Sequence, residues 1–153
     1  MQGRGVPAGS GRSPVWFRLR RVRYFLYEYE EHRAGGKPVA LDWNVLDRRT
    51  LGDTIEHILP QTLTPEWAKE FPTFEHWQYL NDLGNLCLTY GNSSYKNKAF
   101  KDKKGEAGNG KPSYINSTLR QEQDLAVFDV WNKANVMVRR QQLIAWALGR
   151  WGG

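Results

Sequence analysis

Cysteine is nearly absent from the sequence, which contains only Cys87. One cysteine cannot form an intramolecular disulfide, and it cannot build a zinc site that needs several thiolates. The sequence also lacks an apolar run near the roughly 20 residues of a membrane-spanning helix, and residues 1–14 lack the apolar stretch of a secretory signal. We therefore expect a cytoplasmic protein with no membrane partner, whose stability comes from packing.

The composition describes one folded domain with a basic balance of charge. The 153 residues suit a single domain of ordinary size, and 13% aromatic residues are too many for a disordered chain. Lys and Arg number 22 against 16 acidic residues, so the net charge is +6. This excess favours a polyanionic partner, with nucleic acid as the leading candidate and an acidic membrane surface as the weaker one.

The sequence predicts a short leader followed by one domain. Residues 1–14 are rich in Gly, Arg, Ser and Pro, so we interpret them as a flexible leader ahead of a domain at 15–153. Apolar residues then recur at three- and four-residue steps to about residue 33, which predicts an amphipathic helix. Its arginines are expected to form a solvated face, and they are Arg18, Arg20, Arg21 and Arg23.

Two short strands are predicted in the middle of the chain. Residues 54–58 are β-branched and alternating, which indicates a strand that ends near His57. Residues 85–90 indicate a second strand. Short helices are expected between the strands, around Trp67 and Trp77, and the Trp77 side chain is expected in the core.

The last third of the chain is predicted to be helical on either side of a loop. Asn92 is a suitable N-cap for a helix through Phe100, a core residue, and residues 101–113 form a Lys- and Gly-rich loop that we expect to be mobile. Asn132 can cap a final helix. One face of that helix is expected to close the core, and it carries Met137, Ile144, Leu148 and Trp151. The predicted fold class is therefore α+β and mostly helical.

Of the three histidines, His57 has the sequence context of a chemical group. It follows an acidic residue at the end of a predicted strand, and a second strand and an Asn-capped helix come later in the chain. Two strands and a helix, with a His on the first strand and amide or acid ligands elsewhere, form the skeleton of a one-metal phosphodiesterase site. His32 and His76 are expected to have structural roles.

Three ordered blocks resemble a known family. They are residues 54–61 (TIEHILPQ), residues 83–89 (LGNLCLT), and residues 92–100 (NSSYKNKAF) with Lys103. From about residue 15 to residue 151, the sequence resembles the HNH-type (His-Me finger) nuclease domain at the C-terminus of GmrSD-type modification-dependent restriction enzymes. The resemblance implies a small ββα-metal nuclease unit packed among surrounding helices.

The resemblance also implies roles for individual residues. His57 would be the general base, because a neutral imidazole can take a proton from water near physiological pH, and Asn85 would hold its ring. Glu56 would bind the metal with Asn92, or with Asn97 as the second choice, although adjacent residues of a regular strand point to opposite sides. The alternatives are a plain helix cap for Asn92 and a surface position for Asn97. Oxygen ligands suit Mg²⁺ or Mn²⁺ better than Zn²⁺.

Lysines that follow the site are expected to contact the phosphates of DNA, with a merely solvated lysine-rich loop as the alternative. They are Lys96, Lys98, Lys101, Lys103 and Lys104.

The resulting hypothesis is a metal-dependent DNA endonuclease domain that belongs to a restriction or phage-defence system. One alternative is a nucleic-acid-binding or assembly module that keeps the ββα shape without turnover. Another is a nuclease that acts on RNA, which would share the site and differ in its substrate groove. The resemblance further implies recognition of modified bases and an NTP-using, DNA-sensing domain or subunit as a partner.

Overall fold

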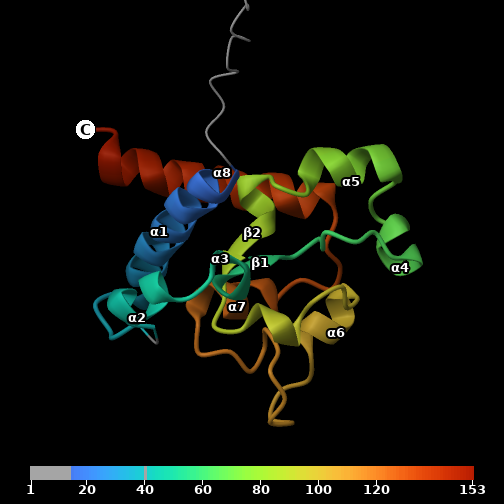
Figure 1. The fold of residues 1–153 in the computed structure, drawn as a ribbon, viewed down its shortest axis with the longest axis horizontal. Helices are drawn as coiled ribbons and strands as arrows, with labels where there is room; N and C mark the ends of the chain where they lie inside the picture. The colour runs from blue at the N-terminus through green and yellow to red at the C-terminus, as the bar shows by residue number, and fades with distance from the viewer. Residues whose placement is uncertain (1–14, 40) are drawn as a thin grey trace, which may run out of the picture.

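The computed structural model describes residues 15–39 and 41–153, with side chains from residue 19 onward, so the predicted leader at 1–14 lies outside the described residues. Helices dominate this part of the chain and surround one small sheet, which confirms the α+β, mostly helical fold class (Figure 1). The elements are α1 (Val15–Ala34), α2 (Trp43–Arg48), α3 (Leu51–Thr54), β1 (Ile55–His57), α4 (Pro65–Ala68), α5 (Thr73–Tyr79), η1 (Leu83–Asn85), β2 (Leu86–Leu88), η2 (Asn92–Ser94), α6 (Phe100–Lys104), α7 (Arg120–Leu125) and α8 (Lys133–Trp151). Within the described residues, no helix combines the length and the hydrophobicity needed to cross a membrane.

The sheet is an antiparallel pair of the two predicted strands. Ile55 pairs with Leu88, Glu56 with Cys87 and His57 with Leu86. Because side chains alternate along a strand, Ile55 and His57 share one face with their partners, and Glu56 and Cys87 share the other. The sheet thereby divides the interior into two apolar clusters.

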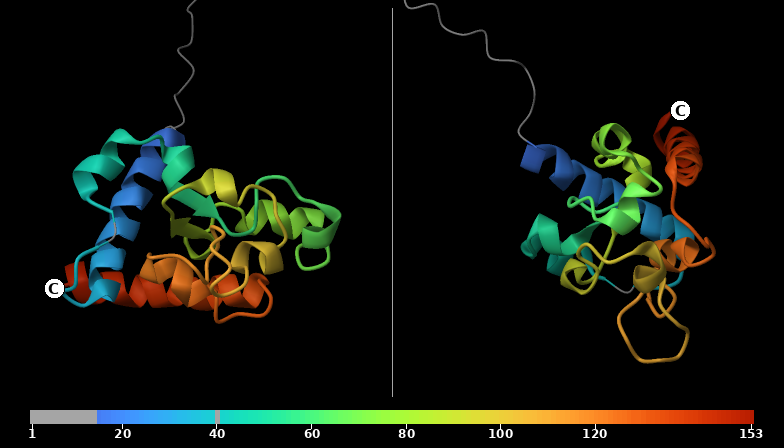
Figure 2. Two further views of the ribbon diagram at one scale, coloured as in Figure 1. Left: turned by 90° about the horizontal axis from the view of Figure 1, so that it is seen from below. Right: turned by 90° about the vertical axis from the view of Figure 1, so that its right-hand side faces the viewer.

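The first cluster lies on the His57 face of the sheet, and the second lies on the Glu56 face. Leu26 of α1 and Leu46 of α2 pack in the first cluster with Ile55. Cys87 packs in the second cluster, with aromatic residues from α4, α6 and the loops that precede α7 and α8. The packing of α1 and α7 around the sheet can be followed in Figure 2.

Helix α1 confirms the amphipathic helix predicted for its segment, and Gly35 and Gly36 follow it with φ of 59° and 86°. These backbone angles lie in the left-handed region, which glycine adopts without a steric cost. The predicted solvated arginine face is wrong at Arg23, which is 2% exposed. Its guanidinium donates to the carbonyl oxygen of Arg49 and forms an ion pair with Asp47 at 3.2 Å. Arg23 thus ties α1 to the end of α2.

The segment after β2 differs from the predicted helix. Asn92 begins the short 3-10 helix η2 instead of capping an α-helix, and Lys96 follows with a φ of 45°. Helix α6 begins at Phe100, so the predicted loop starts only at Gly105. A side chain in the left-handed region cannot continue an α-helix, and this explains the break. Phe100 is buried as predicted, but Trp77 is 85% exposed and the prediction that it lies in the core is wrong.

Helix α8 begins at the predicted cap, with Asn132 and Asn135 in a reciprocal capping box. Its buried residues are Val136, Arg139 and Leu143, so the face predicted to close the core is instead exposed. The geometry of η1 explains this correction. A Cβ at Gly84 would collide with the carbonyl oxygen of Val136, so only glycine permits this close approach. Arg139 lies on the same face and donates to the carbonyl oxygens of Gly84 and Leu86.

Candidate active site

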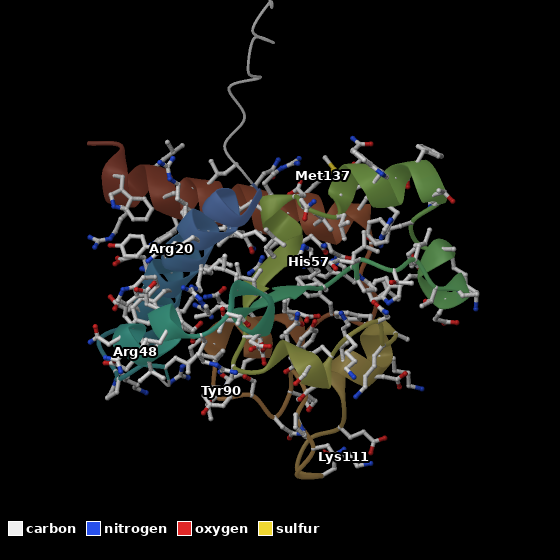
Figure 3. All side chains as sticks on the ribbon, viewed as in Figure 1. Arg20, Arg48, His57, Tyr90, Lys111 and Met137 are labelled. Carbon is white, nitrogen blue, oxygen red and sulfur yellow. The ribbon has the colours of Figure 1, made fainter. Side chains whose placement is uncertain are left out.

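A cavity of about 320 Å³ lies on the His57 face of the sheet. His57 lines it together with Asn92, Asn97 and Lys96, although these residues are far apart in the sequence. The rest of the lining comes from the ends of α1 and β1, α3 and the segment after His57, and it consists of Leu19, Leu51, Gly52, Ile55, Pro60 and Gln61. Figure 3 shows His57 near the middle of the molecule, where α1, α3 and the sheet meet. The structure therefore brings three of the predicted site residues and one predicted lysine to one cavity.

The imidazole of His57 is held by Asn81, a residue that the sequence did not single out. His57 Nε2 lies 3.0 Å from Oδ1 of Asn81. An amide oxygen only accepts hydrogen bonds, so this contact places the proton on Nε2 and leaves Nδ1 as the nitrogen that can take a proton. Burial lowers the pKa of His57 below its ordinary value of 6.5, against the raising effect of the Asn81 bond. His57 is therefore neutral at physiological pH, as a general base requires.

Asn92 is oriented by a bond to the neighbouring helix α3. Its Nδ2 donates to the carbonyl oxygen of Gly52 at 2.8 Å, which fixes the amide and leaves its Oδ1 available. Lys96, also in the lining, has the left-handed backbone described above, a conformation that recurs at functional sites because the surrounding structure must enforce it. Asn97 is exposed and lines the same cavity.

Glu56 lies on the opposite face of β1, away from His57. It is 1% exposed, and its Oε1 accepts hydrogen bonds from Lys103 at 2.5 Å and from Tyr114 at 3.0 Å. Its Oε2 has no hydrogen-bond partner among the described residues. Burial raises the pKa of Glu56 to about 7, against the lowering effects of Lys103 and Tyr114. The expectation that Glu56 and Asn92 share a metal is therefore wrong in this structure, because strand alternation turns Glu56 into the second core.

Lys103 is likewise not a surface residue. Its exposed fraction is 0%, and besides Glu56 its Nζ donates to the carbonyl oxygens of His57 and Ile58 at 2.9 and 3.0 Å. The prediction that Lys103 contacts phosphate is wrong, because Phe100 and Lys103 are one helical turn apart and occupy the inward face of α6. Lys103 instead stabilises the backbone segment that carries His57.

Asn85 also acts on the backbone rather than on the imidazole. Its Oδ1 accepts from the Leu59 N–H at 2.7 Å and from Trp131 Nε1 at 3.2 Å, while its Nδ2 donates to the carbonyl oxygens of Leu59 and Leu80. These four bonds use the full capacity of a buried amide. The predicted bond from Asn85 to the His57 ring is thus corrected, and Asn81 occupies that position.

Three of the predicted lysines are exposed, namely Lys96, Lys98 and Lys101, and Lys96 lines the cavity. Lys104 is half-buried, donates to the Phe128 carbonyl oxygen at 2.9 Å and lies 3.6 Å from a carboxylate oxygen of Asp129. Its charge is therefore partly satisfied within the chain. The exposed three are available for phosphate contacts.

The side-chain oxygen atoms in the cavity are of a type that binds divalent cations, but none of them carries a negative charge. Asn92, Asn97 and Gln61 offer neutral amide oxygens, and no carboxylate is in the lining. Throughout the described part of the chain, no group of three or more His, Cys, Asp or Glu residues is arranged to hold a metal. Mg²⁺ commonly relies on one or two carboxylates together with substrate phosphates. The protein alone can therefore offer only a weak site.

Asn81 and Gln61 are the site residues that sequence reasoning missed. Gln61 is the last residue of the first of the three blocks, so its position four residues after His57 could have indicated a place in the site. Asn81 lies in the turn between α5 and η1, outside all three blocks, and no local pattern marks it. Its contact with His57 depends on how α5 packs, since His76 of that helix bonds to the Pro60 carbonyl oxygen at 2.8 Å.

The fold and the site together define a small α+β domain with one histidine held in a cavity beside a two-stranded sheet. The chain belongs to the family of C-terminal domains of GmrSD restriction endonucleases, whose family model matches residues 8–146. It is therefore a nuclease module related to restriction endonucleases. Comparisons with curated proteins and with solved structures gave no match.

Proposed function

We propose that this domain is an HNH-type endonuclease that hydrolyses phosphodiester bonds in DNA, as part of a restriction or phage-defence system. The observation that carries the proposal is the cavity in which a neutral, oriented His57 lies with Asn92 and Lys96. Membership of the restriction endonuclease family supports a phosphodiester substrate. A DNA backbone is polyanionic, which also fits the net charge of +6.

In this proposal His57 removes the proton from the attacking water. Nδ1 accepts the proton, because Nε2 is committed to Asn81, and the imidazolium that forms is stabilised by the same Asn81 oxygen. Lys103 and Asn85 hold the backbone from His57 to Leu59 and so help to fix where the ring lies. Lys96 at the cavity rim would contact a phosphate oxygen of the bound strand.

Mg²⁺ or Mn²⁺ is the proposed cofactor, with Asn92 as the first choice of protein ligand and Asn97 as the second. A bound divalent cation supplies Lewis-acid stabilisation of the charge that develops on the phosphate. Because only neutral amides are available in the cavity, we propose that the cation is taken up together with DNA, whose phosphate provides the missing charge.

A cleavage assay tests the proposal directly. The protein is incubated with supercoiled plasmid and, separately, with a structured RNA, each with Mg²⁺, with Mn²⁺ and with EDTA, and the His57→Ala variant is run beside it. Cleavage of DNA that requires a metal and His57 supports the proposal. Cleavage of RNA alone favours the RNA-directed alternative, and DNA binding without cleavage favours the non-catalytic module.

Recognition of modified bases and an NTP-using, DNA-sensing partner are further proposals that rest on the family resemblance. A glucosylated plasmid beside an unmodified one, at equal concentration, tests the first. Faster cleavage of the glucosylated plasmid by this domain alone would place base recognition within it. Equal rates on both plasmids would place that recognition outside this domain.

A further inference from the structure

Arg48 and Arg49, at the junction between α2 and α3, form no ion pair with any carboxylate of the described residues. Asp53, the acidic residue of α3, is paired with neither of them. Other arginines of the chain do form such pairs, and they are Arg20, Arg23, Arg33, Arg140 and Arg150. Arg48 is exposed and Arg49 is partly exposed. Both charges are therefore open to an anion from outside the chain.

Tyr90 holds the guanidinium of Arg49 at the surface. Nη1 of Arg49 donates to the carbonyl oxygen of Tyr90, and Cζ lies 5.0 Å from the centroid of the Tyr90 ring. The other N–H groups of this guanidinium bond to nothing among the described residues, and Tyr90 is 64% exposed. Figure 3 shows Arg48 and Tyr90 at the lower left of the molecule, with His57 above and to the right of them. An arginine that is oriented in advance loses less side-chain entropy when it forms a bidentate bond to phosphate.

This arginine pair lies beside the cavity of the candidate active site, at the wall that α3 and η2 form. Arg49 comes two residues before Leu51, and Tyr90 comes two residues before Asn92. Leu51 and Asn92 both line the cavity. The bond from Asn92 Nδ2 to the carbonyl oxygen of Gly52, at 2.8 Å, joins the two segments at this wall. A strand bound in the cavity would therefore pass close to the arginine pair.

We propose that Arg48 and Arg49 bind backbone phosphates of the same DNA strand whose scissile phosphate lies in the His57 cavity. The inference rests on the proposed function and adds a second phosphate-binding segment to the one proposed at Lys96. Two residues of extended chain span at most about 7 Å. Successive phosphates of one strand advance by about 3.4 Å along a duplex. The contacted phosphates are therefore expected about two steps from the one that is cut.

A nucleic acid strand suits this arrangement better than an isolated anion. Lys96 lines the cavity itself, is exposed and has no ion pair among the described residues. Unpaired positive charges thus occur both in the cavity and beside it. A polyanion with one charge at every nucleotide can neutralise all of them at once. A single small anion could satisfy only one.

The salt dependence of DNA binding tests the proposal without cleavage. In the His57→Ala background, the affinity for a fluorescent duplex is measured with Mg²⁺ at several KCl concentrations. Arg48→Gln and Arg49→Gln should each reduce the slope of log affinity against log salt by about 0.9 for each phosphate contacted. Arg49→Lys should keep the slope, because it keeps the charge, while the affinity falls with the loss of the bidentate bond.

Lys111→Gln is the matched control for this measurement. It removes an exposed cation that has no ion pair among the described residues and lies far from His57 in Figure 3. The unfolding temperature of every variant is measured beside its affinity, so that a loss of fold is recognised. Slopes for Arg48→Gln and Arg49→Gln that equal the slope for Lys111→Gln, in folded proteins, would overturn the proposal.

Neutral phosphates test where the arginine pair lies along the strand. The wild-type protein cleaves an end-labelled duplex in which a single phosphate is replaced by an uncharged methylphosphonate. Cleavage of bonds about two steps to one side of the replaced phosphate should fall. In the double variant Arg48→Gln/Arg49→Gln this local fall should disappear, because the contact is already missing. A local fall of the same depth in the double variant would contradict the assigned contact.

The two measurements separate a failure of this inference from a failure of the proposed function. Cleavage by the wild-type protein, with salt slopes that neither arginine changes, would overturn the role of the arginine pair alone. Reduced slopes in the arginine variants without cleavage by the wild-type protein would support the DNA-binding surface and count against the nuclease. Absence of DNA binding by the wild-type protein would overturn both.

Discussion

Glu56 and His57 are neighbours on one strand, yet the two sides of that strand are built for different purposes. On the His57 side the sheet borders a cavity that amide side chains also line, and the ring has one nitrogen not bonded to Asn81. On the Glu56 side the residue is buried, with 1% exposure, and its carboxylate accepts hydrogen bonds from Lys103 and Tyr114. The comparison teaches that of two adjacent residues on one strand, one can serve the scaffold while the other faces a cavity.

Burial acts on both residues, and in both it favours the neutral form. It lowers the pKa of His57 and raises the pKa of Glu56 to about 7. For His57 this shift is useful, because a base must be unprotonated. For Glu56 it reflects the desolvation of a carboxylate whose Oε2 has no partner among the described residues. Removing each side chain in turn should therefore affect different properties of the protein.

The largest effect is expected at His57. Replacing it in His57→Ala should reduce the DNA cleavage rate by about 10² to 10⁴, because the base acts in the transition state. The affinity for DNA and the unfolding temperature should change little. His32→Ala is the matched control, since His32 is exposed on α1 and lies outside the cavity. Full cleavage by His57→Ala would remove this side of the strand from the mechanism.

The other side of the strand should show its effect in stability. Lys103→Met leaves the carboxylate of Glu56 buried without its cation, which should lower the free energy of unfolding by about 3–5 kcal/mol. The double variant Lys103→Met/Glu56→Leu removes both charges and should recover only part of that loss, because the carbonyl oxygens of His57 and Ile58 and the Tyr114 hydroxyl still lose their partners. Lys101→Met, an exposed lysine of the same helix, should change stability by no more than about 0.5 kcal/mol. Urea unfolding of the four proteins measures this, and equal losses for Lys101→Met and Lys103→Met would refute the buried pair.

The parts of this molecule that sequence could predict are those fixed by local chemistry. The strands, the Asn132 cap and the helix ended by Gly35 and Gly36 depend on neighbours in the chain, and all of them are confirmed. The convergence of Asn92 and Asn97 on the His57 cavity followed from the order of the family blocks. The strands, the cap and the helix end need no knowledge of distant contacts, whereas the convergence on the cavity was implied by the resemblance.

The parts that escaped prediction depend on tertiary packing. The face of α8 is chosen by Gly84 and by the carbonyl groups that Arg139 reaches, and its periodicity alone permits either face. The burial of Lys103 depends on which side of α6 meets the sheet. Asn81 reaches His57 only because of the way α5 docks. Each case pairs residues that the chain brings together from a distance.

Asn81 offers a sharper test of the role proposed for His57. In Asn81→Asp, a carboxylate next to Nε2 stabilises the imidazolium and should raise the pKa of His57 by about one unit or more. The wild-type cleavage rate should fall on the acid side with a midpoint below 6.5, since burial lowers this pKa. In the variant the neutral imidazole then forms only at higher pH. The acid limb of its profile of cleavage rate against pH should therefore move to higher pH.

The control for this experiment is Asn81→Ala, which removes the bond without adding charge. We expect it to reduce the cleavage rate about tenfold through misorientation of the ring, while its acid limb stays below that of Asn81→Asp. Measuring the rate against pH for the three proteins separates the two effects. Identical acid limbs in all three would mean that Asn81 does not act on the titrating group.

The smallest effect is expected at the three exposed lysines, where single phosphate contacts contribute to affinity and not to chemistry. Removing one of the exposed lysines, in Lys96→Ala, Lys98→Ala or Lys101→Ala, should reduce the slope of log affinity against log salt by about 0.9 for each phosphate that the lysine neutralises. The reduction should be the same on any DNA sequence, because phosphate contacts carry no sequence information. Lys111→Ala is the matched control, since Lys111 is exposed at the tip of a loop far from His57 in Figure 3. A salt slope that changes with Lys111→Ala as much as with Lys96→Ala would place the DNA elsewhere on the surface.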